Sequence, residues 1–129
     1  MATIFTKIIN GEIPCYKVAE DENYFAFLDI NPVQKGHVLV VPKIEEDYIF
    51  RLKDDVLAGL ILFSKKVALA IEKSVPCTRV AVAVIGLEVP HVHIHLIPIQ
   101  KESDLNFASK KEIASEEMVS VAQLIASNF

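Results

Sequence analysis

Three of the four histidines in this chain alternate with apolar residues in the segment Pro90-His91-Val92-His93-Ile94-His95. Successive side chains of a β-strand point to opposite faces of the sheet, so the three histidines are expected to share one face. The apolar residues between them are then expected to face a hydrophobic core. Because each buried imidazole needs a hydrogen-bond partner, core strands are rarely built in this way. The alternation therefore indicates chemistry at the histidine face.

Two non-catalytic interpretations of this face compete. One is a solvated strand face, which suits a lone histidine better than three beside an apolar run. The other is a metal site. His91 and His95 would lie roughly 13 Å apart along a strand, too far to share an ion easily at bond lengths of about 2.0–2.1 Å. A metal would need two of the three histidines together with His37 or a carboxylate.

The third interpretation is covalent catalysis at a phosphate. A neutral imidazole is a competent nucleophile near neutral pH, and the phosphoryl-histidine that it forms hydrolyses readily. The middle residue, His93, is the natural nucleophile. Its neighbours His91 and His95 can donate hydrogen bonds to phosphate oxygens, where charge builds in the transition state. The chemistry of the residues favours this third interpretation.

The composition describes a single domain spanning residues 1–129, with a mass of 14.3 kDa. Hydrophobic residues make up 52% and charged residues 23%, which argues against disorder. The net charge of −4 gives no electrostatic reason to expect nucleic acid or a membrane as partner. There is no long apolar run and no signal-peptide pattern, so we expect a cytoplasmic protein. Cys15 and Cys77 lack metal-ligand spacing and are interpreted as packing residues.

The local patterns predict an α+β fold with a five-stranded antiparallel meander sheet. One long helix, over residues 56–71 after the acidic pair Asp54-Asp55, is expected between the third and fourth strands. A short N-terminal helix over residues 4–10 and a C-terminal helix behind the capping box 109–112 complete the fold. The five strands are expected at residues 15–20, 24–30, 37–41, 79–85 and 91–97.

The heptad His91-Val-His93-Ile-His95-Leu-Ile97 resembles the signature of the histidine triad (HIT) family of nucleotide-binding proteins and hydrolases. Residues 3–14, 26–32 and 36–43 resemble the other signature blocks of the family, in the same order and spacing. The resemblance covers roughly the first hundred residues, and the short layout is most similar to the phosphoramidase-like branch. It implies a homodimer with one continuous sheet, built through the helix 56–71 and the strand 79–85.

The resemblance also implies roles for single residues. His93 would become nucleotidylated, His95 would contact the α-phosphate, and His91 would bind or orient nearby. His37 would be a fourth histidine, which positions the His93 ring. Asp29 would accept hydrogen bonds from both ribose hydroxyls. The apolar slot around the purine would be formed by Ile4, Phe5, Phe27 and Ile30.

Two departures from the family pattern bear on the chemistry. Many bacterial relatives hold a structural zinc with residues that correspond here to Thr3, Thr6 and Glu45, so we expect no metal and no cofactor. In the loop before the triad Gly86 and Val89 are kept.

In the same loop, however, Leu87 and Glu88 replace a glutamine and a hydroxyl residue. A carboxylate beside an anionic phosphate is unfavourable unless it is protonated or faces away. Glu88 would therefore act as a general acid, bind a cationic leaving group, or point to solvent.

The sequence thus predicts an enzyme that splits a nucleoside monophosphate, AMP or GMP, from its leaving group through a nucleotidyl-His93 intermediate. Nucleoside phosphoramidates and dinucleoside polyphosphates are the two expected substrate classes. The alternative is a purine-nucleotide-binding or interaction module with little catalysis, which the changes at Leu87 and Glu88 favour. The expected partners are a purine nucleotide and a second copy of the chain.

Overall fold

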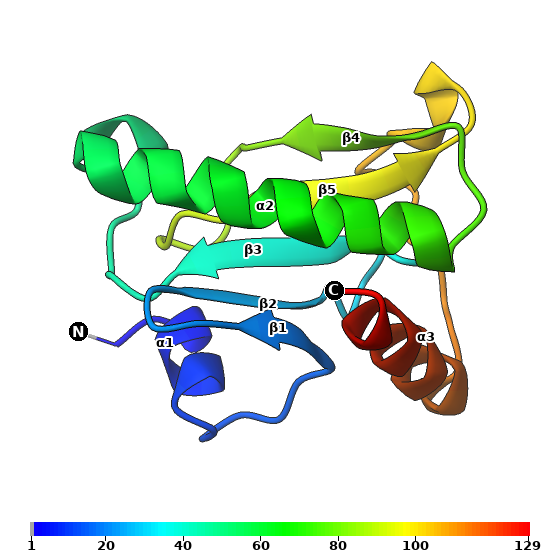
Figure 1. Cartoon of the computed structure of the whole chain (residues 1–129), viewed down its shortest axis with the longest axis horizontal. Helices are drawn as coiled ribbons and strands as arrows, with labels where there is room; N and C mark the ends of the chain where they lie inside the picture. Colours follow the sequence, from blue (N-terminus) through cyan, green and yellow to red (C-terminus); the bar gives the residue numbers. More distant parts are fainter. Residues whose placement is uncertain (1) are drawn as a thin grey trace.

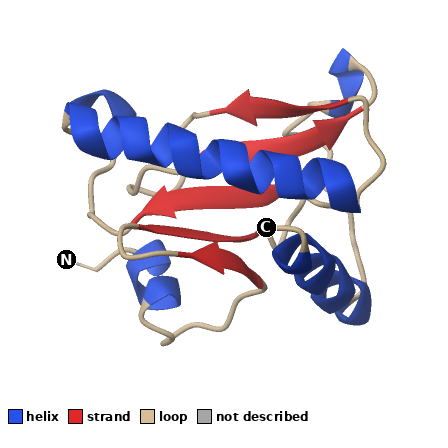
Figure 2. Cartoon of the chain, in the orientation of Figure 1, coloured by secondary structure: helices blue, strands red, loops and turns tan. Residues whose placement is uncertain are grey.

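The computed structural model describes residues 2–129, which form one five-stranded sheet flanked by helices (Figure 1, Figure 2). The strands are β1 (Lys17–Glu20), β2 (Tyr24–Leu28), β3 (Val38–Pro42), β4 (Arg79–Ala83) and β5 (Ile94–Ile99). The helices are α1 (Ile4–Ile9), α2 (Asp54–Ser74) and α3 (Ser115–Ser127), with short 3-10 turns at Ile49–Arg51 and Glu102–Asp104. No helix among the described residues is long and apolar enough to cross a membrane.

Every neighbouring pair of strands is antiparallel, as expected, but the strand order is β1-β2-β3-β5-β4. The expected simple meander is therefore wrong for the last two strands. The long helix α2 returns the chain to the end of the sheet from which β3 started, so β4 runs in the same direction as β3. Because β5 lies between them, all pairings stay antiparallel, and the histidine strand takes an interior position beside β3.

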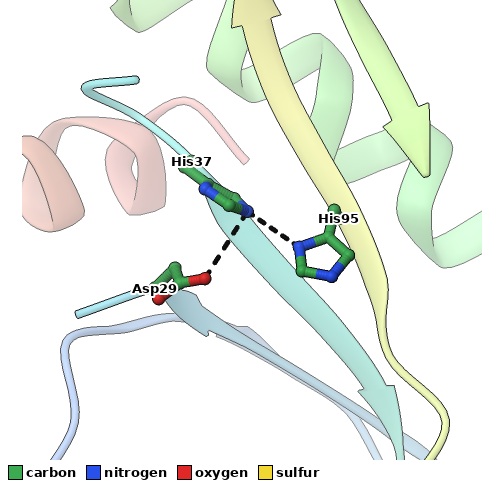
Figure 3. Close-up of side chains that lie close together, drawn as sticks. All are labelled: Asp29, His37 and His95. Carbon is green, nitrogen blue, oxygen red and sulfur yellow. Dashed lines mark hydrogen bonds and ion pairs between the residues drawn. The ribbon is translucent and has the colours of Figure 1, made fainter. Parts of the chain in front are cut away.

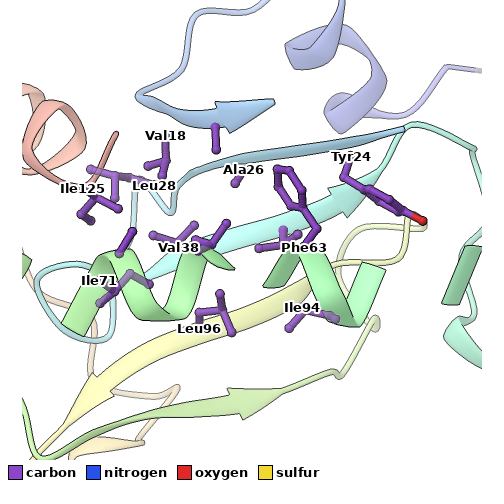
Figure 4. Close-up of a cluster of buried hydrophobic side chains, with 14 of the residues drawn as sticks. Val18, Tyr24, Ala26, Leu28, Val38, Phe63, Ile71, Ile94, Leu96 and Ile125 are labelled. Atoms are coloured by element: carbon purple, nitrogen blue, oxygen red, sulfur yellow. The ribbon is translucent and has the colours of Figure 1, made fainter. Parts of the chain in front are cut away.

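The two faces of the sheet are covered differently. On the helix-covered face, α2 and α3 pack over the sheet, and Figure 4 shows side chains from the strands and both helices meeting there. This core includes Val92, Ile94 and Leu96, which confirms the expected alternation of the histidine segment. The opposite face, here called the cavity face, carries α1 and a smaller cluster formed by Phe5, Phe25, Phe27, Leu39 and Val41.

The histidine strand and the C-terminal helix both start later in the chain than expected. The histidine strand starts at Ile94 instead of His91, because the amide of Val92 donates to the carbonyl of Glu46 (2.6 Å) outside the sheet ladder. The α3 helix starts at Ser115, so the predicted capping box at residues 109–112 is wrong. There the amide of Lys111 donates instead to the carbonyl of Pro32 (2.7 Å). Thr3 caps α1 as predicted, since its side chain accepts from the amide of Thr6.

Candidate active site

A cavity of about 470 Å³ opens on the cavity face of the sheet, beside the small aromatic cluster. In the register of β3 with β5, Leu39 pairs with His95, which places the His95 side chain on this same face. All eight residues expected to bind the nucleotide line the cavity, together with two of the triad histidines. These residues are Ile4, Phe5, Phe27, Asp29, Ile30, Gly86, Glu88, Val89, His93 and His95.

His93 presents a free ring nitrogen to this cavity. Its Nδ1 lies 2.7 Å from the backbone carbonyl of His91, and since a carbonyl can only accept, Nδ1 carries the proton. Nε2 of the neutral ring is then left with its lone pair. The ring of Phe5 packs edge-on against that of His93, with centroids 5.0 Å apart. The contacts therefore fix both the tautomer and the orientation of His93.

A relay of hydrogen bonds orients His95 (Figure 3). The amide of Val33 donates to Nδ1 of His37 (3.0 Å), which leaves the His37 proton on Nε2. That Nε2 lies 2.9 Å from Nδ1 of His95 and donates to it, so the proton of His95 is on Nε2. Burial and neighbouring charges lower the pKa of His37 to about 3 and that of His95 to about 4. Both rings are therefore neutral at physiological pH, and His95 can donate from Nε2.

The relay corrects the role expected for His37. Its hydrogen bond goes to His95, whereas the orientation of His93 comes from the carbonyl of His91. His37 and His91 are both fully buried behind the cavity and do not line it. His37 and the His91 carbonyl contact the rings of His95 and His93 from behind, and His93 and His95 are the two members of the set that line the cavity.

Asp29 follows β2 and lies at the edge of the cavity, with Oδ2 3.6 Å from Nε2 of His37. Burial raises the pKa of its carboxyl group, although the hydrogen bond from the amide of Asn31 (2.9 Å) acts in the opposite direction. Its carboxylate accepts no side-chain hydrogen bond among the described residues. It is therefore available to a ligand with hydroxyl groups, as a ribose has.

Asp29, His37 and His95 place one potential metal-ligating atom each within 4.8 Å of one another (Figure 3). The hydrogen bonds favour another reading of this trio. Nε2 of His37 carries a proton because Nδ1 accepts from Val33, so an ion would have to displace that proton. His37 and His95 are hydrogen-bonded to each other, with Asp29 3.6 Å from His37, and the absence of a metal or cofactor in the working protein stays a prediction.

A second network anchors His91 to α1 and to β3. Nε2 of His91 donates to the carbonyl of Pro42 (2.7 Å), so Nδ1 is unprotonated and accepts from the hydroxyl of Thr3 (2.7 Å). Glu45 accepts hydrogen bonds from the Thr6 hydroxyl (2.6 Å) and from the Thr3 amide (2.9 Å). Thus the N-terminus of α1 is bound to the segment that carries the His91 carbonyl.

This second network also bears on the structural zinc of bacterial relatives. Thr3 and Thr6 offer only neutral hydroxyl oxygens, and the single lone pair of the His91 ring is already engaged by Thr3. Thiolate, imidazole and carboxylate groups are the usual zinc ligands. Glu45 is the one residue among the three positions that offers such a ligand, and its carboxylate already accepts from Thr6 and Thr3. A hydrogen-bonded network holds His91, and the absence of a zinc ion stays a prediction.

The loop before the triad forms one rim of the cavity. Gly86 has a φ of +73°, a conformation that side chains with a Cβ rarely adopt. Leu87 is 88% exposed and Glu88 is exposed as well, yet both line the cavity. Glu88 is therefore at the mouth of the site, where it can meet a ligand group that extends out of the cavity.

Among the lining residues that were not expected, Phe107 and Lys110 come from the segment between β5 and α3. The Phe107 ring packs edge-on against that of His95, with centroids 5.0 Å apart, and the ammonium of Lys110 lies 5.4 Å from the Phe107 centroid. This segment lies beyond the family blocks. The one available signal was an aromatic residue and a lysine in an otherwise polar stretch, which is too common to indicate a site.

Comparison with known proteins is consistent with this geometry. The family profile of the HIT domain matches residues 10–102. An uncharacterized HIT-like protein of Methanocaldococcus jannaschii is 42% identical over an alignment of 125 residues, which covers 90% of this chain and 95% of that protein. The adenosine 5'-monophosphoramidase of Schizosaccharomyces pombe is 40% identical over 103 residues, which are 79% of this chain and 77% of its own.

A solved structure agrees over nearly the whole chain. The crystal structure of a hypothetical histidine triad nucleotide-binding protein from Sulfolobus tokodaii superimposes with a TM-score of 0.85 at 32% identity. The match covers 96% of this chain and 89% of that one. The fold, the histidine geometry and these matches agree, and the chain belongs to the HIT family.

Proposed function

We propose that this protein is a nucleotidyl hydrolase that splits a purine nucleoside monophosphate from its leaving group through a covalent intermediate on His93. The observation that carries the proposal is the tautomer of His93. Its Nδ1 donates to the carbonyl of His91, so the lone pair of Nε2 is available at the cavity. An imidazole with this fixed tautomer needs no base to activate it as a nucleophile.

In the first step Nε2 of His93 attacks the α-phosphorus, and the bond from phosphorus to the leaving group breaks. The leaving group departs with the electron pair of that bond and takes a proton from a group at the mouth of the cavity or from water. The positive charge that develops on the His93 ring is stabilised by the carbonyl of His91 at Nδ1. Nε2–H of His95 donates to a phosphate oxygen, where negative charge increases.

In the second step a water molecule attacks the phosphorus, and the bond to Nε2 of His93 breaks. The products are the nucleoside monophosphate and the neutral His93 ring, with the proton of the water passed to the solvent or to a phosphate oxygen. The ring returns to the same tautomer because Nδ1 never lost its hydrogen bond to His91. The enzyme is thereby ready for another turnover.

The nucleoside is assigned to the part of the cavity beside α1. Phe5, Phe27 and Ile4 offer apolar and aromatic surface for a purine, and Ile30 is 69% exposed at its edge. We assign the two ribose hydroxyls to the Asp29 carboxylate, which lines the cavity and can accept their hydrogen bonds. The choice between adenine and guanine is left to the experiment below.

The test is to incubate the protein with adenosine 5'-phosphoramidate, its guanosine counterpart and a diadenosine polyphosphate, in parallel with His93→Ala. We expect release of the monophosphate, loss of release in the variant, and a nucleotidylated wild-type protein in intact-mass spectra after an acid-free quench. The relative from Schizosaccharomyces pombe is named a monophosphoramidase, so the phosphoramidate is the first substrate to try. Turnover that survives in His93→Ala would contradict the covalent mechanism.

The second candidate function is a nucleotide-binding module with little catalysis. The observation in its favour is the loop, where Leu87 and Glu88 stand in place of amide and hydroxyl groups. The same experiment decides between the two candidates. Nucleotide binding without turnover on every substrate would support the module.

We assign Glu88 to the leaving group, because its carboxylate is at the mouth of the cavity and not beside the relay. A carboxyl group there can protonate a departing amine or attract a cationic one. Replacement with glutamine keeps the shape and removes the charge. If Glu88→Gln left kcat and its pH profile unchanged on every active substrate, the assignment would be abandoned.

We also infer a homodimer in which β4 of two copies extends the sheet. β4 is an edge strand that pairs only with β5, and α2 exposes Ile61, Leu62 and Leu69 on its outer side. Val82 on β4 is 60% exposed, so the edge strand and α2 both present exposed apolar side chains. Gel filtration that gives only the 14.3 kDa species would refute the dimer.

A cytoplasmic location is part of the same proposal. Cys15 and Cys77 are both free thiols and show no pairing, which suits a reducing compartment. Fractionation of cells that express the tagged protein tests the location, and recovery outside the cytoplasmic fraction would contradict it.

A further inference from the structure

We propose that Lys110, in the segment between β5 and α3, binds the anionic phosphate part of the substrate and supplies the positive charge of the site. This inference rests on the proposed nucleotide substrate, and it concerns a residue beyond the part of the chain that matches the HIT domain, residues 10–102. It assigns a function in substrate binding to a segment without triad residues.

The first argument is the balance of charge in the cavity. Among the described residues that line it, Asp29 and Glu88 carry carboxyl groups and Lys110 carries the one cationic group. His95 adds no positive charge, since burial first, and then His93 and Lys110, hold its pKa near 4. A nucleoside phosphate brings at least one negative charge into this site. Without Lys110 no cationic side chain in the lining would offset that charge.

The second argument is where the ammonium lies. Lys110 sits over the ring of Phe107, and that ring packs against His95, the residue that offers Nε2–H to the phosphate. The purine surface of Phe5 and Ile4 belongs to α1, which is a different wall of the cavity. The cationic side chain is therefore adjacent to the phosphate-binding histidine.

The third argument is that the segment is fixed in place. The amide of Lys111 donates to the carbonyl of Pro32 (2.7 Å), and the amide group of the Gln34 side chain donates to the carbonyl of Asp104 (2.8 Å). Pro32 and Gln34 both belong to the turn between β2 and β3, which also carries Asp29 and His37 at its ends. Lys110 is thereby held beside the cavity by hydrogen bonds that do not involve its own side chain, so a substitution of Lys110 leaves them intact.

The chain offers a matched control next to Lys110. Lys111 is also exposed, but it does not line the cavity, and its charge acts on Asp104. Lys111→Met keeps its amide and therefore its hydrogen bond to Pro32. The pair Lys110→Met and Lys111→Met removes the same charge from the same segment, once inside the cavity lining and once outside it.

The experiment is calorimetric titration of wild-type protein and both variants with adenosine, AMP and ADP at low and moderate salt. We expect Lys110→Met to weaken AMP binding roughly 3–10-fold and ADP binding more, while adenosine binding stays the same. Lys111→Met should match the wild type, Lys110→Arg should restore most of the affinity, and added salt should shrink the difference.

Equal affinity of Lys110→Met and wild type for AMP and ADP would overturn the inference. An equal loss for adenosine would overturn it too, because it would mean that the cavity was damaged and not that a charge was lost. Binding alone is measured, so the result does not depend on turnover or on the covalent step. A wild-type protein that binds none of the three ligands would overturn the proposed function together with this inference.

Discussion

On the helix-covered face of the sheet α2 and α3 bury a mainly aliphatic core, whereas on the cavity face α1 covers only part of a mainly aromatic cluster and leaves room for a ligand. The two faces are built from consecutive residues of the same strands. In β5, Ile94 points into the core and His95 reaches the cavity. One face mainly contributes stability, and the other holds polar groups that stability alone would not require.

The difference shows how this small domain tolerates four buried histidines. Each of them has a hydrogen-bond partner, and no buried side-chain nitrogen or oxygen in residues 2–129 lacks one. Much of this partnering comes from the backbone: the carbonyls of His91 and Pro42 and the amide of Val33. Backbone groups cannot rotate freely, so they fix each tautomer more rigidly than side chains would.

The sharpest contrast between the faces is expected from the adjacent residues His93 and Ile94. His93→Ala should lower kcat roughly 10⁴-fold or more, while the free energy of unfolding falls less than in Ile94→Ala, because the ring lines an open cavity and not the core. Ile94→Ala should lower the free energy of unfolding by about 2–5 kcal/mol, since this fully buried side chain leaves a cavity in the core. Urea unfolding and steady-state kinetics measure both effects, and a large stability loss in His93→Ala would break the contrast.

Acid should destabilise the cavity face first. The pKa values of His37 and His95 are lowered to about 3 and about 4, so between about pH 6.5 and those values the unfolded chain binds more protons than the folded one. The stabilisation is complete above pH 6.5 and is lost as the pH falls, by at most roughly 8 kcal/mol in all, since each pKa unit corresponds to about 1.4 kcal/mol. Unfolding curves from pH 7 to pH 4 test this. A His37→Phe variant should lose less stability on acidification, and an equal loss would contradict the assignment.

His37→Phe also tests the relay on the cavity face. The phenyl ring fills the space but cannot donate to Nδ1 of His95, so the His95 proton is no longer confined to Nε2. We expect kcat to fall roughly 10–100-fold with little change in KM, because the effect is on the transition state. The ¹⁵N shifts of the His95 ring report the tautomer directly. A single Nε2–H tautomer retained in the variant would show that the relay is not needed.

The smallest effect is expected at the junction of α1 with His91. Thr3→Val removes the hydroxyl that caps α1 and donates to Nδ1 of His91, so we expect a loss of about 1 kcal/mol in stability and a roughly 3–10-fold lower kcat. Thr3→Ser keeps both hydrogen bonds and should behave like the wild type. A variant with lower stability but unchanged kcat would restrict Thr3 to capping the helix.

Local patterns predicted most of the fold. The acidic pair before α2 and the apolar run after it located a helix of the correct type, and the threonine cap located α1. The capping box before α3 failed because the segment is held by the turn between β2 and β3, which no local pattern encodes. The order of β4 and β5 failed for a similar reason, because pairing is decided by where α2 returns the chain.

The histidine site was likewise predictable from local patterns only in part. By itself the sequence determined that three histidines share a face opposite a core, because the period of a strand is two residues. The sequence also contains the blocks that resemble the HIT family, and these blocks indicated Asp29 and the apolar residues expected around the purine. Only the tertiary structure decided which nitrogen of each ring carries the proton. The partners of His91 and His95, Thr3 and His37, are 88 and 58 residues away in the chain. The tertiary structure also decided that Lys110 lines the cavity. Its position there depends on the packing of segments that are distant in the chain, and that packing leaves no local pattern in the sequence.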